Sequence, residues 1–79
     1  EGFTLVIMNI KGIKLGIIFV ELKDNIKISF RSKGNIAVNK LAMEFKGGGH
    51  KNAAGANVKD SSIRELKEQI LKKAENYID

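Results

Sequence analysis

The spacing of hydrophobic positions changes several times along the chain, and each spacing predicts a different element. Apolar residues fill most of residues 13–22, as is typical of a strand buried on both faces in its middle. Residues 26–31 alternate between apolar and polar side chains, so this strand buries one face and offers a basic face to solvent. Only residues 23–25, which favour a turn, separate the two strands, and the pair is therefore expected to form an antiparallel hairpin.

Two later segments follow the period of an amphipathic helix. The first has Asn35 as a candidate N-cap and an apolar stripe at i, i+3, i+4 and i+7, made of Val38, Leu41, Ala42 and Phe45. The second begins with a capping box of Ser62 and Glu65. Its apolar stripe runs to the end of the chain through Ile63, Leu66, Ile70, Leu71, Ala74, Tyr77 and Ile78.

The remaining segments complete an α+β arrangement. Residues 53–59 are small and weakly alternating and predict a further strand, with Ala54, Ala56 and Val58 on one side. Residues 1–12 contain an apolar run and are interpreted as an interdomain linker or lead-in segment, with a short N-terminal helix as one option. Residues 13–79 then form one domain: a small mixed or antiparallel sheet, built from the hairpin and at least one further strand, covered by two helices.

Composition limits the function more than the fold. The chain has 79 residues, enough for one small domain, and no cysteine to supply disulfides or thiolate ligands. Its net charge of +5 favours an anionic partner, which leaves polyphosphate, nucleotide and RNA open. The apolar run near the start lacks the features of a secretory signal and is too short to span a membrane, so we expect a cytoplasmic protein without a membrane partner.

The strongest chemical signal follows the first predicted helix, at Gly47, Gly48 and Gly49. Consecutive glycines can expose their backbone N–H groups in a concave nest that receives an anion. His50 comes next, and its imidazole can donate a hydrogen bond to a phosphate oxygen. Basic and amide side chains flank the segment: Lys46, Lys51 and Asn52. Taken singly, the glycines fit a helix C-cap and the histidine a surface residue; together they predict anion binding.

Two common phosphate-binding motifs do not fit this segment. Asn52 follows Lys51, so the Lys-Ser or Lys-Thr end of a P-loop is missing. The glycines are consecutive rather than spaced, and no parallel strand–helix–strand unit surrounds them, so they do not match a dinucleotide-binding fingerprint.

Residues 47–55 read GGGHKNAAG, which resembles the GGGH-x-x-AAG signature of the DHH-associated (DHHA) domain. The segments 28–34 (ISFRSKG) and 38–42 (VNKLA) resemble the region that precedes this signature in the nanoRNase and pAp phosphatase branch of the DHH phosphoesterases. The resemblance covers roughly residues 10–75 and keeps the order of elements. Lys46 departs from it, because the branch often has another glycine there.

The resemblance implies that the chain binds the substrate of a metal-dependent phosphoesterase, such as a short RNA or a 3′,5′-bisphosphonucleotide. In this family an N-terminal DHH domain of the same chain holds two divalent ions, manganese or magnesium, and the C-terminal domain faces it across a cleft. The loop residues expected near the phosphate are Gly47, Gly48, Gly49, His50, Lys51 and Asn52. The residues expected at the nucleotide or at the next phosphate are Arg31, Ser32 and Lys33, although a solvated strand face would also explain the two charges.

The residues of this chain do not provide a two-metal centre of their own. Such a centre needs several carboxylates and histidines around ions about 3.5–4 Å apart. The chain has one histidine, and its aspartates fall in predicted turns or at the terminus: Asp24, Asp60 and Asp79. We therefore expect these 79 residues to bind no metal or cofactor and to be inactive alone, as part of a longer hydrolase.

Other functions stay open at this point. A non-catalytic module for single-stranded nucleic acid would need stacking aromatics, whereas the four phenylalanines are expected to face the core: Phe3, Phe19, Phe30 and Phe45. Within the DHH group, RecJ-type exonucleases, cyclic-dinucleotide phosphodiesterases and alanyl-tRNA synthetase editing domains carry variants of the same glycine loop. The run from His50 to Gly55 resembles the nanoRNase branch better. The oligomeric state is not predicted.

Overall fold

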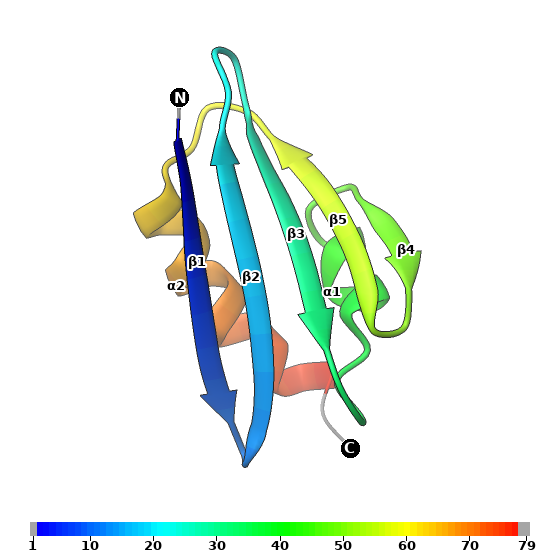
Figure 1. Ribbon diagram of the computed structural model, residues 1–79. Helices are drawn as coiled ribbons and strands as arrows, with labels where there is room; N and C mark the ends of the chain where they lie inside the picture. Colours follow the sequence, from blue (N-terminus) through cyan, green and yellow to red (C-terminus); the bar gives the residue numbers. More distant parts are fainter. Residues whose placement is uncertain (1, 78–79) are drawn as a thin grey trace.

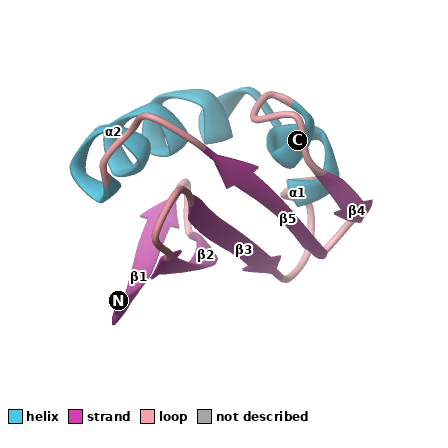
Figure 2. Cartoon of the chain, turned by 90° about the horizontal axis from the view of Figure 1, so that it is seen from above, coloured by secondary structure: helices cyan, strands magenta, loops and turns pink. Residues whose placement is uncertain are grey.

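The computed structural model describes residues 2–77 and consists of one antiparallel sheet with two helices on the same side of it (Figures 1 and 2). The strands are β1 (Gly2–Ile10), β2 (Ile13–Glu21), β3 (Ile26–Ser32), β4 (Gly48–His50) and β5 (Ala53–Val58). The helices are α1 (Val38–Met43) and α2 (Ile63–Ala74), which is followed by a 3₁₀ turn, η1 (Glu75–Tyr77). The strands lie in the order β1-β2-β3-β5-β4, and every neighbouring pair is antiparallel. The predicted α+β fold is confirmed.

The hydrophobic core lies between the sheet and the helices. The alternation along β2 and β3 sends one set of side chains toward the helices, where they are fully buried: Leu15, Ile17, Phe19, Ile28 and Phe30. Phe45 stacks near Phe30 with ring centroids 6.4 Å apart. Burial of each such side chain stabilises the fold by about 1.5–3 kcal/mol. Phe3 was expected in this core, but it is 75% exposed on the other face of the sheet, so that prediction is wrong.

The first nine described residues form a strand, β1, so the option of a short N-terminal helix is wrong. Lys11 and Gly12 have φ angles of 52° and 82°, as a two-residue type I′ turn requires. This turn pairs β1 with β2 along its whole length, from Gly2 opposite Glu21 onward. The division into a linker (1–12) and a domain (13–79) stays a prediction, although β1 belongs to the same sheet as β2.

Helix α1 begins and ends differently from the prediction. Its N-cap position is Ala37, without a side-chain cap, so the capping by Asn35 is wrong. At the other end Lys46 has a φ of 63°, the left-handed conformation that usually selects glycine. The N–H of Gly47 donates to the carbonyl of Ala42 at 2.8 Å. This is the hydrogen bond of a Schellman motif that spans six residues. The helical turn is therefore closed by Lys46, before the three glycines.

Helix α2 agrees with its sequence pattern at the start and along most of its length. The Ser62 hydroxyl accepts a hydrogen bond from the backbone N–H of Glu65 at 3.2 Å, which confirms the predicted N-cap. Its buried stripe consists of Leu66, Ile70 and Ala74. Leu71, expected in this stripe, is 46% exposed, and Ile78 lies outside the described residues.

A polar cluster connects the end of α1 to the C-terminal turn. The Glu44 carboxylate lies 2.9 Å from Lys73 Nζ and also accepts a hydrogen bond from the Tyr77 hydroxyl. The hydrogen bond from Tyr77, followed by that from Lys73, lowers the pKa of Glu44. The same hydrogen bond raises the pKa of Tyr77, because ionised tyrosine would face the carboxylate. The cluster therefore favours an ionised Glu44 and a protonated Tyr77.

Candidate functional site

The sheet face opposite the helices is free of other described elements and carries the predicted site residues (Figure 2). Cross-strand pairing places one residue from each strand in a single row: Ile7, Gly16, Arg31, Ala53 and His50. Residues paired across antiparallel strands point to the same face. Arg31 and His50 therefore share this face, with only the small Ala53 between them. Two strand spacings of about 4.8 Å separate their backbones by roughly 10 Å.

The next row explains why a ligand can approach the backbone here. It runs Leu5, Ile18, Ser29, Gly55 and Gly48, so its β3, β5 and β4 members are all small. The polar half of the open face thus has a floor of serine, alanine and glycine beside Arg31 and His50. The sequence showed that residues 53–59 are small, but not that Ser29 of β3 lies beside them, because this depends on the pairing of β3 with β5.

The surroundings of the three consecutive glycines differ, and only two of the positions exclude a side chain. A Cβ on Gly47 would lie 2.0 Å from the carbonyl oxygen of Gly55, so no side chain fits there. Gly49 has a φ of 147°, and its Cβ would lie 2.6 Å from Ala54 Cα. Gly48, by contrast, has no described atom within 4 Å of its Cβ position. Packing therefore requires Gly47 and Gly49, whereas at Gly48 the backbone is open to a ligand.

The backbone of the three glycines does not form the concave nest that the sequence predicted. Gly48–His50 are extended and pair with β5, opposite Gly55, Ala54 and Ala53. Pairing to β5 prevents these residues from curling around an anion with successive N–H groups. Their use as anion ligands therefore depends on the His50 side chain and on the exposed side of the strand.

The two predicted contact segments are joined by hydrogen bonds. The Asn52 side-chain amide donates to Ser32 Oγ at 3.0 Å and to the Gly34 carbonyl at 3.3 Å. The Ser32 hydroxyl donates to the Ile36 carbonyl at 2.9 Å, and the Ser32 N–H donates to the Asn52 carbonyl at 3.1 Å. Ser32 and Asn52 thus hold the end of β3 against the β4–β5 turn. Their predicted substrate contacts stay predictions, but their positions fix Arg31 relative to His50.

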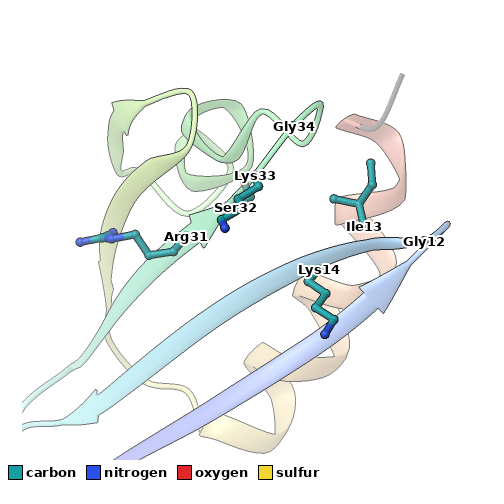
Figure 3. A pocket seen from close by; sticks show the side chains of 7 residues that line it. All are labelled: Gly12, Ile13, Lys14, Arg31, Ser32, Lys33 and Gly34. Atoms are coloured by element: carbon teal, nitrogen blue, oxygen red, sulfur yellow. The ribbon is translucent and has the colours of Figure 1, made fainter.

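A hollow of about 640 Å³ lies where β2 begins and β3 ends (Figure 3). Its lining includes Lys14, Ser32 and Lys33, and Lys14 is a basic residue that sequence reasoning missed. Figure 3 shows Arg31 extended away from Lys14, toward β5. Arg31 Nη1 accordingly donates to the Phe30 carbonyl at 2.8 Å and lies 3.5 Å from the Ala54 carbonyl. The hollow and the row between Arg31 and His50 are thus adjacent parts of one basic region.

Lys51 lies apart from the other predicted contacts. It lines a separate hollow of about 400 Å³ with Asn39, Lys40 and Tyr77. Its carbonyl accepts the N–H of Val38 at 2.8 Å, which ties the β4–β5 turn to the start of α1. The structure therefore does not bring Lys51 to the row of Arg31 and His50.

Within residues 2–77, no group of three or more histidine, cysteine, aspartate or glutamate side chains is placed to hold a metal ion. None of the helices in this range is long and apolar enough to cross a membrane. The described open face carries cations and hydrogen-bond donors, among them Arg31 and His50.

Comparison with known proteins assigns the chain to one family. The DHHA1 domain family matches residues 4–79. The bifunctional oligoribonuclease and PAP phosphatase NrnA of Bacillus subtilis is 48% identical over 50 residues, which cover 63% of this chain and 16% of that protein. The protein of the same name from Thermus thermophilus is 28% identical over 71 residues, covering 90% of this chain and 22% of that protein. The chain thus spans about a fifth of its relatives, and it belongs to the DHHA1 domain family.

Proposed function

We propose that this chain is the substrate-binding domain of a metal-dependent DHH phosphoesterase that acts on short oligoribonucleotides or 3′,5′-bisphosphonucleotides. The row on the open face carries this proposal, because it places Arg31 and His50 on either side of Ala53. The substrate class is supported by the names of the two relatives, an oligoribonuclease and PAP phosphatase in both cases.

Charge and surface shape support a nucleotide ligand. The guanidinium of Arg31 can bind a phosphate through two parallel hydrogen bonds, and the imidazole of His50 can donate one. Their separation of roughly 10 Å leaves room for a sugar or a second phosphate between them. The net charge of +5 attracts such an anion before contact is made. Lys14 and Lys33, in the adjacent hollow, extend the basic region beyond Arg31.

Hydrolysis requires a second domain in this proposal. Two divalent ions, manganese or magnesium, in a DHH domain of the parent chain would supply a metal-activated water. The described residues of this chain would hold and orient the phosphate and nucleotide and take no part in bond cleavage. A parent protein without an upstream cluster of aspartates and histidines would contradict this division of labour.

The binding part can be tested by NMR titration of the 79-residue chain with adenosine 3′,5′-bisphosphate. We expect amide shifts at Arg31–Lys33 and Gly48–His50, and weaker binding as salt rises. Arg31→Gln and His50→Gln should each weaken binding about tenfold, because each removes a charged or strong hydrogen bond to phosphate. Lys67→Gln is the matched control: it removes one exposed charge from α2, on the helical side, and should change affinity less than about twofold.

The titration also separates the alternatives. Equal losses in Lys67→Gln and Arg31→Gln would indicate attraction by net charge alone, as in a non-catalytic nucleic-acid-binding module. Shifts confined to other segments would contradict the site. A RecJ-type exonuclease or a cyclic-dinucleotide phosphodiesterase would be indicated if the parent protein preferred long single strands or cyclic dinucleotides over short RNA.

A further inference from the structure

Strand β1 is an edge of the sheet without the usual protection of an edge. Within the described residues it has a neighbour on one side only, β2. Its nine residues, Gly2–Ile10, include no charged residue and no proline. Edge strands in soluble proteins are commonly short, charged or interrupted by proline, because free backbone groups pair readily with another strand. The opposite edge, β4, meets this expectation with only three residues.

The free backbone groups of β1 can be assigned from the hydrogen bonds of β2. The N–H of Leu22 donates to the carbonyl of Asn25 at 2.9 Å, so even-numbered residues of β2 direct their backbone groups toward β3. Odd-numbered residues of β2 then face β1, where each is paired with an even-numbered residue, as Ile17 is with Val6. The outward backbone groups of β1 therefore belong to Phe3, Leu5, Ile7 and Asn9.

The side chains of these residues also lie on the open face of the sheet. Phe3, Leu5 and Ile7 are 75%, 58% and 56% exposed. Ile18, paired with Leu5 on β2, adds a further side chain that is 38% exposed. A contiguous apolar patch of this kind on a soluble domain marks an interaction site. Its position along a free strand edge indicates a partner that brings a strand of its own.

We propose that β1 pairs with β1 of a second copy of this chain, antiparallel and symmetric about Val6. Pairing centred on Val6 is the symmetric register that lets all four outward residues exchange hydrogen bonds. It places Phe3 opposite Asn9 of the second copy and Leu5 opposite Ile7 of the second copy. Val6 then meets the same residue of the second copy in a non-hydrogen-bonded pair, on the helical side.

Charge favours a second copy at this edge rather than elsewhere. Each chain carries a net charge of +5, so the repulsion between two copies is smallest where the surfaces that meet are uncharged. Strand β1 is such a surface. Arg31 and His50 lie on β3 and β4, at least two strands from the seam. The two sheets would join into one continuous sheet, with both copies of the basic region facing the same side.

The proposal predicts a dimer of the 79-residue chain in sedimentation equilibrium, with a matched pair of variants to locate the interface. Leu5→Lys places a charge at the seam, diagonally across the two-fold axis from the same charge of the second copy. It should raise the dimer dissociation constant on the order of tenfold or more. Met43→Lys adds the same charge at a residue of α1 that is 65% exposed, and should leave the dissociation constant within about twofold. A monomer at millimolar concentration, or a dimer equally sensitive to both variants, would overturn the proposal.

The register can be tested separately with single cysteines, because the chain has none of its own. Val6→Cys should form a disulfide-linked dimer on mild oxidation, since non-hydrogen-bonded pairs bring Cβ atoms close enough for a disulfide. Asn57→Cys, on the exposed face of β5, should not. Nucleotide binding by the monomeric Leu5→Lys variant should be unchanged, so failure of the dimer would leave the proposed function untouched. Equal cross-linking of both cysteine variants would reject the register.

Discussion

On the β4–β5 side of the open face, small residues lie beside Arg31 and His50, namely Ala53, Gly55 and Gly48. The alternate glycines, Gly47 and Gly49, lie close to the backbone of β5. On the β1–β2 side, Phe3, Leu5 and Ile7 project from an uncharged edge strand. The first side is low and has open space at Gly48, whereas the second carries large, exposed side chains. In the two proposals made above, one sheet face binds a nucleotide at one end and a second copy of this chain at the other.

The largest effect should come from adding one methyl group on the glycine side. Gly49→Ala would bring Cβ to 2.6 Å from Ala54 Cα at a φ of 147°, and should lower the free energy of unfolding by about 3 kcal/mol or more. Leu5→Ala removes three carbons from a side chain that is 58% exposed, and should cost under about 1 kcal/mol. Urea unfolding at a protein concentration where the chain is monomeric measures the free energy of unfolding of both variants. Similar losses of unfolding free energy in the two variants would contradict the difference between the two sides of the sheet.

A second matched pair turns to the hydrogen bonds that connect the site. Asn52→Ala removes the donor to Ser32 Oγ and to the Gly34 carbonyl, and should cost about 1–2 kcal/mol. It should also shift the amide resonances at the end of β3 and weaken nucleotide binding, because Arg31 loses its fixed position. Asn57→Ala, which removes an exposed hydrogen bond with Asn25, should cost under about 0.5 kcal/mol and leave those resonances unchanged. If both variants bind nucleotide like the parent, Asn52 does not position Arg31.

The smallest expected effect is a stabilisation at the entrance to the glycine strand. Lys46 occupies a left-handed conformation with a φ of 63°, so Lys46→Gly should raise the free energy of unfolding by roughly 0.5–1 kcal/mol. Lys40→Gly, inside α1, should lower it by about 1 kcal/mol, because glycine is a poor helix former there. Thermal unfolding compares the two. Destabilisation by Lys46→Gly would mean that the lysine side chain contributes more than the backbone conformation costs.

Sequence periodicity was sufficient for the elements whose burial follows a simple period. The alternation of residues 26–31 and the stripe and capping box of α2 predicted β3 and α2 well, because one face of each packs on the core. Strand β1 was missed because its residues are apolar on both faces, so alternation gives no signal. The predicted boundary at residue 12 falls on its turn, but a hairpin was not predicted there, since Lys11 is an uncommon residue at a positive φ.

The candidate site was predicted as a set of residues rather than as a geometry. The sequence placed Arg31–Lys33 and Gly47–Asn52 near each other only through a family resemblance. The shared row of Arg31 and His50 depends on the register of three strand pairings, which no local pattern specifies. For the same reason the three glycines looked equivalent, although only Gly47 and Gly49 are required by their neighbours.

This difference among the glycines has an evolutionary consequence. Under the proposed function, family members that no longer bind a nucleotide should still have glycine at positions 47 and 49, since replacement there would disrupt the fold. Position 48 has free space around its Cβ, so it should drift to other residue types once no ligand approaches the strand. The residue at position 48 would then identify, from sequence alone, which members of the family still bind a substrate.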